Sequence, residues 1–245
     1  MVIEVSDVWK RFRLREDRVD GFAKLMVRMF LSQKRINRPS DFWALREINF
    51  SVPDNTSFGI VGVNGSGKST MLKLLTGTMK PTKGHIRVKG RKSSLIELGA
   101  GFHSDFSGRD NVYLNGLILG LSKADIRKRF DEIVDFAELE EFIDVPVKYY
   151  SSGMQARLGF AVATAVEPDI LIVDEVLAVG DMNFREKCMT KIMQMQAKGV
   201  SVVLVSHGLG DVERVCQRAM WLDHGRMMAY GPATEVVSAY SRWIQ

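Results

Sequence analysis

The most specific chemical pattern in the sequence is a run of glycine, serine and lysine at residues 62–70. The run reads Gly62-Val63-Asn64-Gly65-Ser66-Gly67-Lys68-Ser69-Thr70 and fits the phosphate-loop pattern G-x-x-x-x-G-K-[ST]. Glycines let backbone N–H groups converge on phosphate oxygens, and a helix that begins at Lys68 adds a favourable dipole for anions. Lys68 would reach the outer phosphates of a nucleotide, and the Ser69 hydroxyl would ligate Mg²⁺. A glycine-rich turn without a ligand is the alternative.

A second pattern is an apolar stretch that ends in two acids, Asp174 and Glu175. An apolar strand here would place both carboxylates at the edge where parallel sheets bind phosphate ligands. Asp174 would hold Mg²⁺ through water, and Glu175 would polarise the water that attacks the γ-phosphate. Apolar strands that end in acids are common, but together with the phosphate loop this one predicts an enzyme that hydrolyses a nucleotide.

Strand and helix patterns alternate around these motifs. Residues 57–61, 169–174 and 200–205 are nearly continuous in apolar residues, which is typical of buried parallel strands. Two earlier strands are expected at Val2–Val5 and Ala44–Val52. Helices are expected from Lys68 and near residues 109–120, 123–137, 153–166, 183–198, 209–216 and 233–243. This order predicts an α/β fold, a parallel sheet with helices on both faces.

Composition bounds the class of protein. The chain has 245 residues, 46% hydrophobic and 26% charged, which suits one large globular domain at 1–245. No apolar run approaches the roughly 20 residues that cross a bilayer, and the N-terminus lacks a signal-peptide pattern. We therefore expect the chain on the cytosolic side of the membrane. Cys188 and Cys216 have no metal-like spacing and are expected to be buried free thiols.

The net charge of +5 is concentrated in one segment, residues 13–38, with eight basic and three acidic residues. Its apolar residues Phe22, Leu25, Met26, Met29 and Phe30 share one helical face. A basic amphipathic helix suits an anionic lipid surface. A helix packed on its own domain with a solvated basic side is the alternative. We treat residues 13–43 as an insertion between the first two strands.

Between the two nucleotide motifs, Tyr150-Ser151-Ser152-Gly153-Met154 precedes a helix of small residues. In this order and spacing, the chain resembles the ABC ATPase family over essentially its whole length, with these residues at the family's signature. The resemblance implies a P-loop NTPase parallel sheet, an antiparallel β subdomain and an inserted helical subdomain at about 100–165. It also implies a homodimer in which Ser151, Ser152, Gly153 and Met154 of one copy meet the ATP of the other. An ordinary serine-capped helix start is the alternative.

The same resemblance assigns further residues. His207 would contact the γ-phosphate and Asp181 would face the partner copy. Adenine would stack on Phe12, with Trp43 as the alternative. The glutamine expected near residues 96–102 is missing, and Glu97 is the candidate to replace it near Mg²⁺.

The segments Glu97–Phe102, Tyr150–Met154 and Asp174–Phe184 resemble one branch of the family, the exporters of lipid-linked polysaccharide and of teichoic acid. That branch implies an integral membrane permease as partner, a lipid-linked, O-antigen-like glycan as substrate, and a peripheral place on the cytoplasmic face of the inner membrane. No nucleic acid is expected. Because the chain stops at Gln245, we expect no C-terminal carbohydrate-binding domain. A soluble ABC ATPase that acts on nucleic acid or the ribosome is the rival interpretation.

Overall fold

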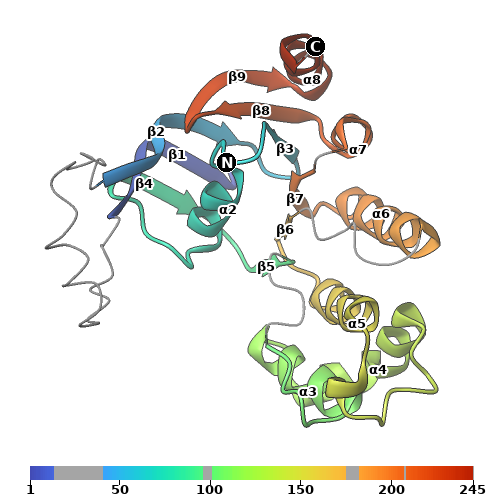
Figure 1. Cartoon of the computed structure of the whole chain (residues 1–245). Coiled ribbons are helices and arrows are strands. Elements are labelled where there is room, and N and C mark those ends of the chain that lie inside the picture. Colours follow the sequence, from blue (N-terminus) through green and yellow to red (C-terminus); the bar gives the residue numbers. More distant parts are fainter. Residues whose placement is uncertain (14–40, 96–100, 175–181, 207, 245) are drawn as a thin grey trace, which may run out of the picture.

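Two β-sheets form the framework of the protein in its computed structural model, which describes residues 1–13, 41–95, 101–174, 182–206 and 208–244 (Figure 1). The larger sheet has the strand order β5-β6-β7-β3-β8-β9. Its strands are β3 (Ser57–Val61), β5 (Lys92–Ser94), β6 (Ile170–Val173), β7 (Ser201–Val205), β8 (Arg218–Asp223) and β9 (Arg226–Pro232). All neighbours pair in parallel except β8 and β9.

The central strands β3, β6 and β7 are buried at every position. Both of their faces are covered, because one hydrophobic cluster contains residues of α6 and α8, and a second contains residues of α2 and the smaller sheet. A parallel strand covered on both faces needs apolar residues at successive positions, which is why these strands could be recognised. The predicted parallel sheet is confirmed.

The smaller sheet is antiparallel, with the order β2-β1-β4. Its strands are β1 (Ile3–Arg13), β2 (Asp41–Val52) and β4 (Lys83–Val88). The hairpin of β1 and β2 extends further than the expected Val2–Val5 and Ala44–Val52. Register shifts interrupt the alternation of side chains, and pairing resumes beyond them, up to Arg13 opposite Asp41. The predicted basic amphipathic helix lies outside the described residues.

Three helices pack together: α3 (Gly108–Ile118), α4 (Lys123–Ala137) and α5 (Ser152–Ala165) (Figure 1). Helix α5 also contacts β5 and so joins this helical group to the larger sheet. Ser107 and Ser122 cap the N-termini of α3 and α4, each in a capping box. The serine hydroxyl accepts a bond from the backbone N–H of Asp110 or Asp125, and the aspartate carboxylate accepts one from the serine N–H. Their shared core is apolar and a short helix, η1 (Val147–Tyr149), leads into α5.

The other helices lie against the larger sheet or at its edge: α2 (Lys68–Thr76), α6 (Met182–Ala197), α7 (Leu209–Val215) and α8 (Ala233–Ile244). The start of α2 at Lys68 is as predicted, and the other helix ends lie within two residues of the expected ones. Cys188 and Cys216 are buried free cysteines, as expected, and burial raises the pKa of the Cys188 thiol to about 12. Within the described ranges, no helix has the length and apolar character needed to span a bilayer.

Candidate functional site

The phosphate loop joins β3 to α2 at the carboxyl end of β3, as the sequence predicted. Gly62, Gly65 and Gly67 have φ values of 149°, 80° and 112°, a region that other residues rarely adopt. A Cβ atom on Gly62 would lie 2.2 Å from the Leu222 carbonyl oxygen. On Gly67 it would lie 2.9 Å from the Ala44 carbonyl oxygen. Two of the three glycines are therefore required by close backbone approach as well as by conformation.

Lys68 folds back over this loop. Its Nζ donates to the carbonyl oxygens of Gly62, at 2.9 Å, and Val63, at 3.1 Å, and the residue is 5% exposed. The neighbouring Ser66 Oγ is buried and has no hydrogen-bond partner among the described residues. A buried hydroxyl without a partner is costly, and a phosphate oxygen would supply one. The loop therefore fits a nucleotide phosphate, with Ser69 exposed at its rim.

Asp174 follows β6 at the same edge of the sheet, because β3, β6 and β7 run parallel. Since β7 separates β6 from β3, the strand ending at Asp174 and the strand feeding the phosphate loop are about 10 Å apart. That spacing leaves room for phosphates and a cation between Asp174 and Ser69. The arrangement suits a metal-assisted phosphoryl transfer.

Ser206 directly follows the intervening strand β7 and precedes His207, the residue predicted to contact the γ-phosphate. Its hydroxyl accepts a bond from the Gly208 N–H at 3.0 Å and lies 3.1 Å from Asp211 Oδ2. Arg185 of α6 donates to the same carboxylate oxygen at 2.5 Å. These three side chains, which sequence reasoning missed, hold the residues on both sides of position 207. A serine directly before the candidate histidine was the only available signal.

The signature residues form the N-terminus of α5. The Ser151 hydroxyl caps the helix by accepting a bond from the Met154 N–H at 3.2 Å. Ser151 and Ser152 are exposed, and Gly153 lies in the first turn, where backbone N–H groups have no partner within the helix. Tyr150 is anchored beneath them, because its hydroxyl donates to the Phe142 carbonyl oxygen at 2.7 Å. Burial raises the pKa of Tyr150 to about 12.

The two candidate adenine platforms lie on opposite faces of the β1–β2 hairpin. Trp43 contacts the Trp9 ring at 5.5 Å and the Arg11 guanidinium at 5.5 Å. Phe12 instead contacts Lys10, whose Nζ donates to the Lys80 carbonyl oxygen in the loop after α2. A register shift between the pairs Lys10–Leu45 and Arg11–Trp43 lies between the Lys10 contacts and the Trp43 contacts. Lys10 pairs with Leu45, whose side chain is a neighbour of the phosphate-loop glycine Gly67.

Four predicted site residues lie outside the described residues: Glu97, Glu175, Asp181 and His207. Their roles stay predictions. The structure brings together Lys68, Ser69 and Asp174 at one edge of the sheet and puts Ser151 and Gly153 on a separate helix.

The structure thus contains a glycine-rich loop after a parallel strand, an acid after the strand two positions away, and a serine-capped helix of small residues. The first two define a nucleotide site, and the helix is its separate second half. The sequence profile described as "ABC transporter" matches residues 45–178, which contain all three features. The chain belongs to the ABC transporter family. Membership makes it an ATPase, with ATP as its substrate.

Similar proteins of known description agree with this family. The chain is 50% identical to the O-antigen export system ATP-binding protein RfbB of Myxococcus xanthus, over 97% of its own length and 55% of that protein. It is 42% identical to the protein of that name from Klebsiella pneumoniae, over 98% of both chains. It is 37% identical to the teichoic acids export ATP-binding protein TagH of Listeria innocua, over 98% of this chain and 69% of that protein.

Solved structures confirm the fold. An ATP-binding subunit of an ABC transporter superposes with a TM-score of 0.79 at 21% identity, over 98% of this chain and 94% of that one. A dimeric ATP-binding cassette in a post-hydrolysis state, bound to ADP and Pi, gives 0.75 at 22% identity, over 94% of this chain and 98% of that one. The predicted ABC ATPase fold is confirmed.

Proposed function

We propose that this ATPase powers the export of a lipid-linked, O-antigen-like polysaccharide through a separate membrane permease. The observation that carries the proposal is the identity of 42% over 98% of both chains to an O-antigen export ATP-binding protein. The chain spans 55% of the Myxococcus relative, so substrate and partner are inferred from the part that the two proteins share.

The geometry supports a head-to-tail homodimer as the working unit. Lys68, Ser69 and Asp174 lie at the sheet edge, whereas Ser151 and Gly153 start a helix of the separate helical group. In a head-to-tail pair, the α5 N-terminus of each copy would cover the phosphate loop of the other. Ser151 would keep its cap, because a hydroxyl can accept from Met154 N–H while donating its proton to a phosphate oxygen.

Within each composite site, the residues divide the work. Lys68 would exchange its bonds to the Gly62 and Val63 carbonyl oxygens for the outer phosphates. The Gly153 N–H and the α5 dipole would stabilise negative charge on the γ-phosphate from the other side. Ser69 and Asp174 would hold Mg²⁺, whose bound form neutralises charge on the phosphate oxygens. Glu175 would orient and polarise the attacking water, and His207 would contact the γ-phosphate.

For the adenine, Phe12 is favoured over Trp43. Phe12 shares a face with Lys10, which reaches the loop after α2, whereas Trp43 is already packed against Trp9 and Arg11 on the other face. Phe12 is half-buried, and base stacking requires an accessible aromatic face on the phosphate-loop side.

The same proposal implies a permease partner and a location at the membrane. ATP-driven closure of the dimer would move the helical groups, and the permease would take up that movement. The chain would then lie peripherally on the cytoplasmic face of the inner membrane. Teichoic acid export is the second candidate, supported by 37% identity to TagH over 98% of the chain.

The test is to express tagged Glu175→Gln protein in its native host, solubilise membranes with ATP, and identify what co-purifies by mass spectrometry. The proposal expects a multi-span membrane protein with a polyprenyl-linked polysaccharide. A glycerol- or ribitol-phosphate polymer would favour teichoic acid export instead. Ribosomal proteins or nucleic acid without a membrane partner would overturn both exporters and favour a soluble ATPase.

A further inference from the structure

The chain from Ser151 to Asp174 links the two half-sites that each copy would contribute to the dimer, one to each composite site. It begins with the signature serine, continues as α5 to Ala165, turns at residues 166–169, and ends as β6 just before Asp174. Helix α5 has 14 residues and is therefore about 21 Å long. A rotation of about 10° at its C-terminal end would move Ser151 by about 4 Å. The turn thus controls where the signature lies relative to the nucleotide edge.

The turn has an unfavourable backbone conformation. Glu167 has a φ of 48°, which non-glycine residues adopt rarely, and it directly precedes Pro168. A residue before proline is also biased toward extended conformations. The joint between α5 and β6 therefore needs contacts from elsewhere in the fold to keep its shape.

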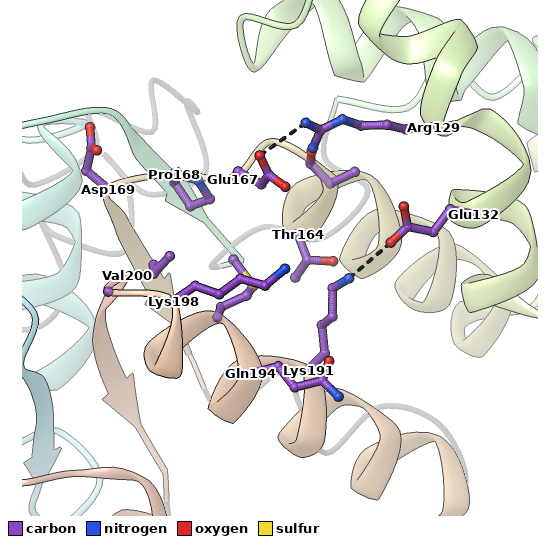
Figure 2. Close-up of a pocket in the computed structure, with 13 residues that line it drawn as sticks. Arg129, Glu132, Thr164, Glu167, Pro168, Asp169, Lys191, Gln194, Lys198 and Val200 are labelled. Atoms are coloured by element: carbon purple, nitrogen blue, oxygen red, sulfur yellow. Dashed lines mark hydrogen bonds and ion pairs between the residues drawn. The ribbon is translucent and has the colours of Figure 1, made fainter.

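Two arginines from different parts of the protein supply those contacts. Arg129 of α4 donates from Nη1 to the Ala165 carbonyl oxygen and from Nη2 to Glu167 Oε2 at 3.1 Å. On the sheet side, Arg91 Nη2 donates to the Glu167 carbonyl oxygen at 2.6 Å. The backbone N–H of Arg91 donates to Asp169 Oδ2 at 2.6 Å. Figure 2 shows Arg129 pointing from the helical group onto this joint.

Open space lies on one side of the joint. A pocket of about 610 Å³ separates α4 from the C-terminal end of α6, with Thr164, Lys191 and Lys198 on its walls (Figure 2). Lys191 pairs with Glu132 at 3.3 Å across this space. Because a pocket replaces close packing on this side of the joint, polar contacts hold the joint here, whereas on its other side Phe160 and Ala163 of α5 pack into the core of the larger sheet.

The Arg129–Glu167 pair contributes little as a surface ion pair, since the side chains are 32% and 63% exposed. The geometry of Arg129 matters more, because its one planar guanidinium contacts both the carbonyl oxygen of Ala165, the last residue of α5, and the side chain of the strained Glu167. A lysine at this position would offer its donors from one ammonium at the end of a flexible stem, without the rigid planar fork that fixes the two contacts relative to each other.

The geometry points to Arg129 as a positioning residue for ATP hydrolysis: through Ala165 and Glu167 it sets the angle between α5 and β6, and so the position of Ser151 in the composite site. This inference rests on the proposed role of Ser151. Arg129 itself touches neither nucleotide nor reacting atoms in that scheme.

Two measurements on the full-length chain test it, with Arg129→Ala and Arg129→Lys compared with Lys191→Ala. The control removes the Lys191–Glu132 ion pair across the same pocket, and this pair includes neither Ala165 nor Glu167. The first measurement is the distance between spin labels at Tyr149→Cys and Lys83→Cys, taken without nucleotide. Both positions are exposed, and the native cysteines are buried. Both Arg129 variants should broaden or shift the distance distribution, and Lys191→Ala should leave it unchanged.

The second measurement is the steady-state ATPase rate. Arg129→Ala should lower kcat about 10-fold while KM changes less than about 2-fold, because displacement of the signature affects the assembled site and not the phosphate loop. Unchanged distances in Arg129→Ala, or equal broadening in Lys191→Ala, would overturn the inference. A wild-type chain that hydrolyses no ATP would instead refute the proposed function, while the distance measurement would still decide the role of Arg129.

Discussion

Replacement of Gly62 by alanine should damage the phosphate loop far more than replacement of Gly65. Both glycines have positive φ, at 149° and 80°, so alanine costs each about 1–2 kcal/mol in backbone strain. Only at Gly62 does the new Cβ collide, lying 2.2 Å from the Leu222 carbonyl oxygen of β8. At Gly65 a Cβ meets nothing within 4 Å.

The collision must be relieved by moving β8 or the loop by about 1 Å, which adds about 1–3 kcal/mol, as overpacking does elsewhere. Gly62→Ala should therefore lose about 2–5 kcal/mol of unfolding free energy, and Gly65→Ala about 1–2 kcal/mol. Urea unfolding measures both values, and a fluorescent ATP analogue reports whether the loop still binds. Equal unfolding midpoints for the two variants would refute the argument from close backbone approach.

Four further predictions concern the aromatic residues and one ion network. Phe12→Ala should weaken ATP binding about 10-fold, whereas Trp43→Ala should change it less than about 3-fold, in equilibrium titrations; the reverse order would move the adenine to the other face. Tyr150→Phe should cost about 1 kcal/mol in urea unfolding, because the Phe142 carbonyl loses its donor. In the wild type, the Tyr150 hydroxyl should stay protonated through pH 11 in ultraviolet titration, given its pKa of about 12. Lys187 and then Arg157 lower the pKa of the Glu138 carboxyl below its ordinary value of 4.5. The ion network therefore stabilises the fold above about pH 4.5, and this stabilisation is lost as the pH falls through the lowered pKa. Urea midpoints should therefore fall more steeply below about pH 4.5 in the wild type than in Glu138→Gln.

The sequence was informative where one local pattern determines one structure. The phosphate loop, the start of α2 at Lys68 and the buried strands β3, β6 and β7 follow from glycine placement and continuous apolar runs. The capping of α5 by Ser151 follows from serine before a helix. These features depend on neighbours in sequence, so a single sequence carries them.

Features that depend on distant contacts could not be read in this way. The extension of β1 to Arg13 depends on register shifts in its pairing with β2. Strands β8 and β9 were not predicted, because they are defined by their pairing with each other. The contacts of Arg129 join residues 36 and 38 positions away, and nothing near Arg129 in the sequence indicates them. Likewise, the faces of Phe12 and Trp43 were undecided until the register of the hairpin was known.

In the proposed dimer, two copies share each ATP through Ser151. The most direct test is the mass of purified Glu175→Gln protein by light scattering, with ATP and with ADP, alone and combined with Ser151→Ala. We expect a dimer with ATP, a monomer with ADP, and a monomer with ATP in the double variant, which should still bind nucleotide. A chain that binds ATP yet stays monomeric, or a dimer that survives the loss of Ser151 unchanged, would contradict this sharing.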